Sequence, residues 1–355
     1  MNLATEVRPG ANRYATGKNI LHELPQYLEP FKKVAVVTGT ISYQIFSDYY
    51  KKELEYPIFR YDGSASREDA HRIAEEIGEA DVIVAIGGGR VLDTGKLVAD
   101  EMNIDAIMVP TLISNCAPFT PIVAVYHPDR TFREMGFMTR APYLTLIDYD
   151  FLLATPKDYF VAGIGDTVAK WYEIKGITEQ LSADEKSAYI RLGIASAKVI
   201  LDILLEDSIQ GIKDLENQQI TPAFERVADT IIGLAGETGG FAATYGRSAG
   251  AHAVHDGLSY LESTHNQLHG NKVAYGILVQ LAHTNEIDEI KKLKDFYQAT
   301  GLPLKLAELN VTQTDAEALK PCTDHAASEE ETFRMIDPEI TPEQVYQAIQ
   351  VVESL

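Results

Sequence analysis

The first 150 residues alternate short apolar runs with stretches that have the period of a helix. The runs are rich in β-branched residues, which is typical of buried strands, and segments such as REDAHRIAEEIGEA lie between them. Strands separated by helices of this length predict a parallel sheet covered by helices on its faces. The predicted strands are Val34–Thr38, Val82–Ile86, Ala106–Pro110 and Tyr143–Asp148.

From about Pro156 the pattern changes to long helical segments. Ser182, Thr221 and Thr341 stand where N-caps are expected, and proline follows each of the two threonines at the first helical position. We therefore predict an α/β domain over residues 1–152 and an all-helical domain over residues 153–355. A cleft between two such halves is a common place for a ligand site.

The composition excludes several classes of partner. The net charge of −21 disfavours nucleic acid and anionic membranes, so we expect a small-molecule substrate. Two distant cysteines do not form a disulfide framework. The first ten residues lack the apolar segment of a signal peptide, and no apolar run is long enough to span a bilayer. We expect a cytoplasmic protein.

A glycine-rich turn follows the second predicted strand. The segment VIVAIGGGRVLDTGK passes from a buried strand into Gly87, Gly88 and Gly89 and then into a helix that contains Asp93. Such a turn lets the backbone approach a pyrophosphate closely at a helix N-terminus. It matches neither GxGxxG nor a P-loop, and an ordinary tight turn remains the alternative.

The next strand is followed by VPTLISNCAPFT, which offers the hydroxyls of Thr111 and Ser114 at a second strand end. An ordinary polar loop explains these residues equally well. Cys116 is a candidate nucleophile, although a small buried thiol is the more common role of such a cysteine.

Four of the nine histidines fall within eighteen residues: His252, His255, His265 and His269. His252 and His255 are three apart, so a helix would present both on one side. Asp166 follows the glycines of VAGIGD and is interpreted as opening a helix, either as a dipole-favoured carboxylate or as a metal ligand. Two histidines and a distant carboxylate would form a three-ligand site with an open position, but spacing alone does not name the ligands.

Five segments together resemble the iron-containing alcohol dehydrogenase superfamily, and in particular its glycerol dehydrogenase branch. They are GGGRVLDTGK, VPTLISNCAP, GIGDTVAKWYE, AGAHAVHDGL and HGNKVAYGILVQL, in that order, between about residues 30 and 290. The resemblance implies a Rossmann-like dinucleotide-binding domain, followed by a helical domain of the kind also found in dehydroquinate synthase, and a divalent metal in the cleft. It also implies self-association.

Carried over residue by residue, the resemblance implies that Asp166, His252 and His269 are the metal ligands. His255 becomes a neighbour of the metal and, with Cys116, a candidate catalytic residue, whereas His265 has no role. The residues expected to bind the cofactor are Gly39, Gly87, Gly88, Gly89, Asp93, Thr111, Ser114, Thr120 and Tyr126.

Three departures from the family pattern refine this expectation. Lys170 replaces a histidine that iron-dependent members carry, so zinc is favoured over Fe²⁺ or another divalent ion. Cys116 replaces an aspartate of glycerol dehydrogenases, as in hydroxycarboxylate dehydrogenases. Gly39 replaces an aspartate typical of NAD-preferring members, which favours NADP(H) over NAD(H), with Thr40 and Ser42 as phosphate donors and no arginine adjacent in sequence.

We therefore predict a metal-dependent dehydrogenase that transfers a hydride between NAD(P)(H) and a 2-oxo acid/2-hydroxy acid pair. The alternative is a glycerol dehydrogenase that interconverts glycerol and dihydroxyacetone with NAD. A lyase similar to dehydroquinate synthase is less favoured because its highly anionic substrate does not suit this charge. A non-catalytic binding protein is less favoured because the ligand set is intact.

Overall fold

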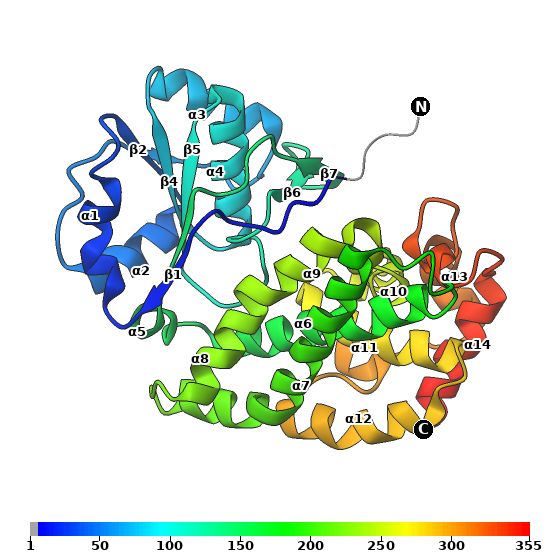
Figure 1. The fold of residues 1–355 in the computed structure, drawn as a ribbon. Coiled ribbons are helices and arrows are strands. Elements are labelled where there is room, and N and C mark those ends of the chain that lie inside the picture. Colours follow the sequence, from blue (N-terminus) through cyan, green and yellow to red (C-terminus); the bar gives the residue numbers. More distant parts are fainter. Residues whose placement is uncertain (1–5) are drawn as a thin grey trace. The chain divides into compact units, whose positions relative to one another are not determined.

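The computed structural model describes residues 6–355, which divide into two compact units (Figure 1). The α/β unit consists of Arg8–Pro156 and Asp214–Gly236, and the helical unit consists mainly of Lys157–Lys213 and Glu237–Leu355. The predicted boundary after residue 152 lies close to Pro156. The segment 214–236, however, belongs to the α/β unit although it follows a long helical stretch. The prediction of a single domain boundary does not include this second crossing of the chain into the α/β unit.

A six-stranded parallel sheet forms the centre of the α/β unit, in the order β1-β8-β5-β4-β2-β3. The predicted fold class is confirmed. The four predicted strands correspond to the four inner ones, and the two edge strands were not predicted. A separate antiparallel hairpin is formed by β6 and β7. The strands are β1 (Tyr14–Gly17), β2 (Val34–Thr38), β3 (Ile58–Arg60), β4 (Val82–Gly87), β5 (Asp105–Pro110), β6 (Ile122–Tyr126), β7 (Phe132–Phe137) and β8 (Leu144–Asp148).

Helices cover both faces of the sheet because successive strand residues point to opposite sides. In β4, Val84 and Ile86 pack into one core with the helix α2, whereas Ile83 and Ala85 pack into a second core with α3 and α4. The helices of this unit are α1 (Leu24–Leu28), α2 (Thr40–Tyr50), α3 (Arg67–Ile77), α4 (Gly89–Met102), α5 (Tyr149–Leu152) and α8 (Pro222–Asp229).

Polar contacts attach the returning segment to the α/β unit. Thr221 accepts a hydrogen bond from the backbone N–H of Phe224 and so caps α8, as predicted. At the other end of α8, the carboxylate of Asp229 accepts hydrogen bonds from the hydroxyls of Tyr14 (2.9 Å) and Tyr149 (2.7 Å). These contacts explain why α8 belongs with the sheet.

In the helical unit, α11 packs against α6 and α10, and these three helices are largely buried. The predicted N-cap Thr341 is also confirmed, whereas Ser182 does not cap the next helix, which begins at Ala188. None of the helices described is both long and apolar enough to cross a membrane. The remaining helices are α6 (Lys157–Thr178), α7 (Ala188–Glu216, shared between the units), α9 (Ala235–Ala242), α10 (Gly250–Leu258), α11 (His269–His283), α12 (Ile287–Thr300), α13 (Ala316–Ala326) and α14 (Pro342–Ser354).

Candidate functional site

Two helices approach each other closely where the predicted metal ligands lie. Asp166 lies within α6, not at the start of a helix as predicted. A Cβ atom on Gly165 would lie 2.8 Å from the carbonyl oxygen of Gly270, and one on Gly270 would lie 1.8 Å from that of Ala162. Only glycine permits this approach of α11 to α6, which brings Asp166 near His269, the first residue of α11.

The three predicted ligands converge within the helical unit. The Nε2 atoms of His252, on α10, and His269 each lie 3.3 Å from Oδ1 of Asp166. Across residues 6–355, this is the one group of three or more His, Cys, Asp or Glu side chains whose ligand atoms all lie within 4.8 Å of one another. One carboxylate and two imidazoles form a donor set that fits a divalent transition metal.

Glu173 orients His252 from the opposite side of its ring. The nearly buried carboxylate of Glu173 lies 2.9 Å from Nδ1 of His252 and accepts hydrogen bonds from the backbone N–H groups of Ala249 and His252. Nδ1 therefore donates the proton of this hydrogen bond, and Nε2 is the nitrogen that faces Asp166 and would bind a metal once it has lost its own proton. Glu173 was not predicted, although its spacing of seven residues from Asp166 places both on one side of α6.

The charges of these groups are strongly coupled. Burial opposes ionisation of Asp166, but the imidazoles of His269 and His252 hold the pKa of its carboxyl well below the usual range. Burial also opposes protonation of His252, but the carboxylates of Glu173 and Asp166 raise its pKa to about 10. The site thus contains two buried carboxylates and favours positive charge between them.

The other two histidines of the segment differ from each other. Nε2 of His255 lies 2.9 Å from Nδ1 of His269, and burial together with the charge of His269 lowers the pKa of His255 to about 3. His255 is therefore a neutral imidazole that contacts a proposed ligand. His265 is exposed and is not part of the group. Lys170, one turn after Asp166, donates its ammonium to the backbone carbonyl of Arg247 at 2.6 Å.

The glycine turn lies at the carboxyl end of β4, in the α/β unit. Gly88 precedes the first residue of α4, Gly89. A Cβ atom on Gly87 would lie 2.4 Å from that of Val91, and one on Gly89 would lie 3.1 Å from the amide nitrogen of Asn115. The close packing of Val91 therefore requires glycine at residue 87. The first backbone N–H groups of α4, at the end of the same strand, fit an anion such as a pyrophosphate.

The loop after β5 runs beside this turn. The backbone N–H of Thr111 donates to the carbonyl oxygen of Gly87 at 3.1 Å, and Ser114 is half-buried in the same loop. Tyr126 ends β6, and its ring lies 5.0 Å from the guanidinium of Arg90, in the first turn of α4. Thr111 and Tyr126 are thus both adjacent to the strand end where a dinucleotide is expected.

Cys116 is half-buried in this loop, and its backbone carbonyl accepts hydrogen bonds from the N–H groups of Phe119 and Thr120. Gly39 lies at the equivalent end of β2, where it precedes α2. These predicted residues therefore belong to the same unit as the glycine turn, whereas His255 belongs to the helical unit.

Asp93 and Lys96 form a buried ion pair that sequence reasoning did not recognise. Their charged atoms are 2.9 Å apart, and Asp93 also accepts a hydrogen bond from the backbone N–H of Ala124. Lys96 additionally donates to the carbonyl oxygens of Ala117, Thr120 and Ile122. The structure therefore gives Asp93 a role in holding the loop between β5 and β6.

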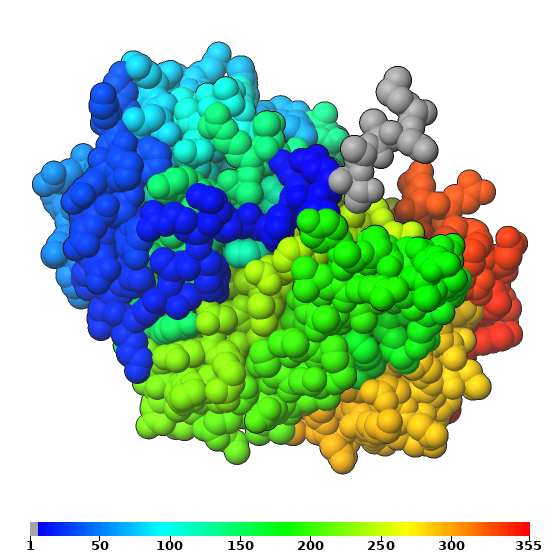
Figure 2. Space-filling model, viewed as in Figure 1, coloured from blue at the N-terminus to red at the C-terminus, as the bar shows by residue number. Residues whose placement is uncertain are grey.

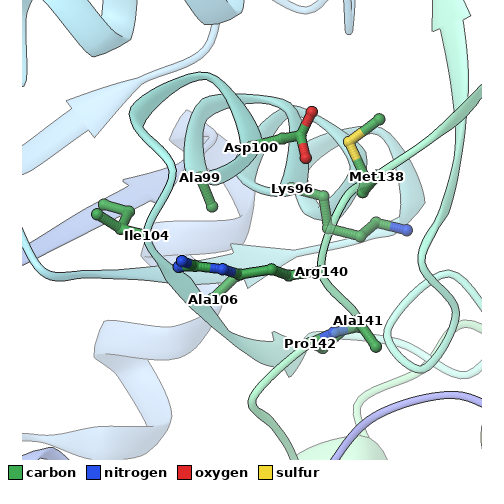
Figure 3. A pocket seen from close by; sticks show the side chains of 9 residues that line it. All are labelled: Lys96, Ala99, Asp100, Ile104, Ala106, Met138, Arg140, Ala141 and Pro142. Carbon is green, nitrogen blue, oxygen red and sulfur yellow. The ribbon is translucent and has the colours of Figure 1, made fainter.

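A small pocket lies on the α/β unit at the amino end of β5, beside Ala106 and Arg140 (Figure 3). Its volume of about 10 Å³ suffices for a single water molecule. The glycine turn lies at the carboxyl end of the neighbouring strand, so this pocket is not the dinucleotide site.

Comparison with known proteins identifies the family. The sequence model of the family "Iron-containing alcohol dehydrogenase" matches residues 11–149 of this chain. Hydroxycarboxylate dehydrogenase A of Escherichia coli is 36% identical over 293 residues, which cover 82% of this chain and 80% of that protein. Glycerol dehydrogenase of Thermotoga maritima is 31% identical over 367 residues, which cover 99% of this chain and 97% of that protein.

Solved structures agree with the sequence comparison. The crystal structure of a probable glycerol dehydrogenase from Sinorhizobium meliloti 1021 superposes with a TM-score of 0.87 at 27% identity and covers 99% of both chains. Members of the matched family bind NAD(H) and a divalent metal, for which the glycine turn and the three donors supply fitting groups. Since the identity extends along nearly the whole chain, the protein belongs to the iron-containing alcohol dehydrogenase family and is a dehydrogenase that acts on CH–OH groups.

Proposed function

We propose that this protein transfers a hydride between NADP(H) and a 2-oxo acid/2-hydroxy acid pair, with zinc as its metal. The observation that carries the proposal is the convergence of Asp166, His252 and His269. Three protein donors of nitrogen and oxygen suit a tetrahedral zinc that keeps one position for substrate. When bound there, zinc would supply Lewis acidity to the substrate oxygen.

The protein's own residues would perform the remaining tasks. Glu173 fixes the tautomer and ring orientation of His252, and neutral His255 forms a hydrogen bond with His269. The glycine turn and Thr111 would hold the pyrophosphate at the end of β4, where backbone N–H groups favour an anion.

The choice of a 2-oxo acid depends on Cys116. A carboxylate at this position, as in glycerol dehydrogenases, would accept a hydrogen bond from a polyol and would repel a substrate carboxylate. A thiol removes both effects, and an unpaired buried hydroxyl would cost a polyol about 1–3 kcal/mol. The similarity to a protein named hydroxycarboxylate dehydrogenase supports this choice.

Glycerol and dihydroxyacetone with NAD are the second candidate. This candidate is supported by the match to the Thermotoga maritima glycerol dehydrogenase, which covers nearly the whole of both chains. The chemistry would be the same, and only the substrate contacts would differ.

A substrate panel distinguishes the two candidates. The zinc-reconstituted protein is assayed at 340 nm with 2-oxo acids, dihydroxyacetone and glycerol, each with both the NAD and the NADP forms of the cofactor. We expect the highest kcat/KM for a 2-oxo acid with NADPH. A preference for glycerol with NAD would select the second candidate, and no turnover with any pair would refute the dehydrogenase assignment to these substrates.

Replacing Glu173 by glutamine tests the orienting role. We expect the E173Q variant to bind zinc about 10- to 100-fold more weakly, because His252 loses the carboxylate that fixes its ring. The dissociation constant is measured by competition with a chromogenic chelator. The E262Q variant, which changes an exposed glutamate of the same unit, is the control. Equal zinc affinity in E173Q and wild type would show that Glu173 has no part in metal binding.

A further inference from the structure

Arg60 lies beside the position where the family pattern would have an aspartate. It ends β3, which pairs in parallel with β2, and Thr38 is its partner in the register. Gly39 follows Thr38, so the guanidinium of Arg60 reaches the end of β2. Its Nη1 atom donates to the carbonyl oxygen of Gly39 at 2.7 Å, and its Cζ atom lies 4.3 Å from the centre of the Tyr43 ring. The sequence has no arginine next to Gly39, but the fold supplies one from 21 residues later.

The charge of Arg60 is not matched by a carboxylate of residues 6–355. Other arginines of the same unit form ion pairs: Arg67 with Glu134, Arg72 with Asp69, and Arg133 with Glu68. Arg60 is exposed, its hydrogen bond goes to a neutral carbonyl, and its guanidinium has five N–H donors. In a chain with a net charge of −21, an arginine held by a ring and a carbonyl can accept an anion from outside.

Gly39 places no carboxylate beside Arg60. A Cβ atom here would lie 2.9 Å from the Tyr61 ring and 3.0 Å from the hydroxyl of Ser42, so Gly39 is closely surrounded on this side. A carboxylate at residue 39 would compete with a phosphate for Arg60 and would repel it. The hydroxyl of Ser42 accepts a hydrogen bond from the N–H of Gly39 at 3.3 Å, so it lies at this strand end together with the guanidinium of Arg60. Thr40 is the first residue of α2.

We propose that Arg60 is the residue that recognises the 2′-phosphate of NADP(H). The proposal rests on the dinucleotide-dependent function proposed above and names the group that sets the cofactor preference. A guanidinium can bind two phosphate oxygens in parallel hydrogen bonds, which makes it stronger and more selective than hydroxyls alone. The adenine-ribose part of NAD(H) lacks this phosphate and would gain little from Arg60.

The experiment measures binding, independently of turnover. Isothermal titration of the zinc-loaded full-length protein compares adenosine 2′,5′-bisphosphate with adenosine 5′-monophosphate, and NADPH with NADH. The variants are R60A, R60K and, as a control, R133A, which removes an exposed arginine of the same unit that is paired with Glu68. Thermal melting verifies that each variant is folded.

We expect R60A to weaken the two 2′-phosphorylated ligands about 10- to 100-fold and to change the other two less than about threefold. R60K should fall between R60A and wild type, and R133A should equal wild type. The preference of the wild type should also decrease as salt is raised, and R60A should lose this dependence.

The outcomes separate the inference from the proposed function. If R60A weakens all four ligands equally, Arg60 only supports the strand end and the inference is wrong. If R60A changes none of them, the inference is also wrong, while dinucleotide binding stands. If the wild type binds neither NADPH nor NADH, the proposed function itself fails.

Discussion

The H269A variant is expected to lose both its metal and its turnover. His269 is one of the three donors of the proposed metal site, so its removal would leave Asp166 and His252 as a two-ligand site. Loss of a Lewis acid worth several kcal/mol predicts that kcat falls by a factor of about a thousand or more. Zinc content is measured by mass spectrometry after reconstitution and desalting. Turnover is measured at 340 nm with the best pair of the substrate panel.

The control for this variant is H265A. His265 belongs to the same segment but is exposed and lies outside the ligand group, so its replacement should leave zinc content and rate unchanged. Stoichiometric zinc and a normal rate in H269A would remove this residue from the ligand set. An equal loss in H265A would mean that the segment as a whole, not one imidazole, had been disturbed.

The K96A variant is expected to have the largest effect on stability. Lys96 is almost completely buried, and its removal leaves Asp93 and three backbone carbonyls without their cation. Breaking a buried pair from one side costs about 3–5 kcal/mol of unfolding free energy. Burial already raises the pKa of Asp93 although Lys96 opposes it, so the lone carboxyl would be costly to ionise. The loss of stability should therefore be greater at pH 8 than at pH 5.

Urea unfolding followed by circular dichroism tests this expectation. The double variant D93N/K96M removes both charges and should recover a large part of the loss, because no unpaired charge remains buried. The K33A variant breaks an exposed pair with Glu79 and should cost less than about 1 kcal/mol. If K96A is no less stable than K33A, the buried pair does not hold the loop between β5 and β6.

The inner strands of the sheet could be predicted because they are buried on both faces. Such strands contain continuous apolar runs, as in Val34–Thr38, whose five residues are all buried. The edge strands gave no such signal: Tyr14–Gly17 contains only half-buried and exposed residues, and Ile58–Arg60 has three residues, of which the last is exposed. Their pairing depends on neighbours that are remote in sequence.

Of the three predicted N-caps, two begin a helix in the structure and one does not. Thr221 and Thr341 cap their helices as expected, whereas the helix predicted to follow Ser182 begins at Ala188. The hydroxyl of Ser182 instead accepts a hydrogen bond from the N–H of Glu185 in a separate turn. One capping residue can serve a turn or a helix, and distant packing decides between them.

The candidate site shows the same division between local and distant information. The pairing of His252 with Glu173 and of Arg60 with Gly39 joins elements far apart in the chain. The histidine spacing indicated a ligand group, and the resemblance named its members. The glycine before Asp166 suggests a helix start in the sequence, but Gly165 lies inside α6. A glycine is needed there because the backbone of α11 lies close to it, which the local sequence does not show.

That backbone contact has a consequence for redesign. Since the carbonyl of Ala162 occupies the space where a side chain of residue 270 would begin, main-chain atoms set the separation between the His269 imidazole and the Asp166 carboxylate. Substituting the side chains at residues 166 and 269 alone would leave the separation of the two backbones unchanged. To fit a larger cation at this position, a protein engineer would first have to increase the distance between α6 and α11, beginning with a substitution at Gly270.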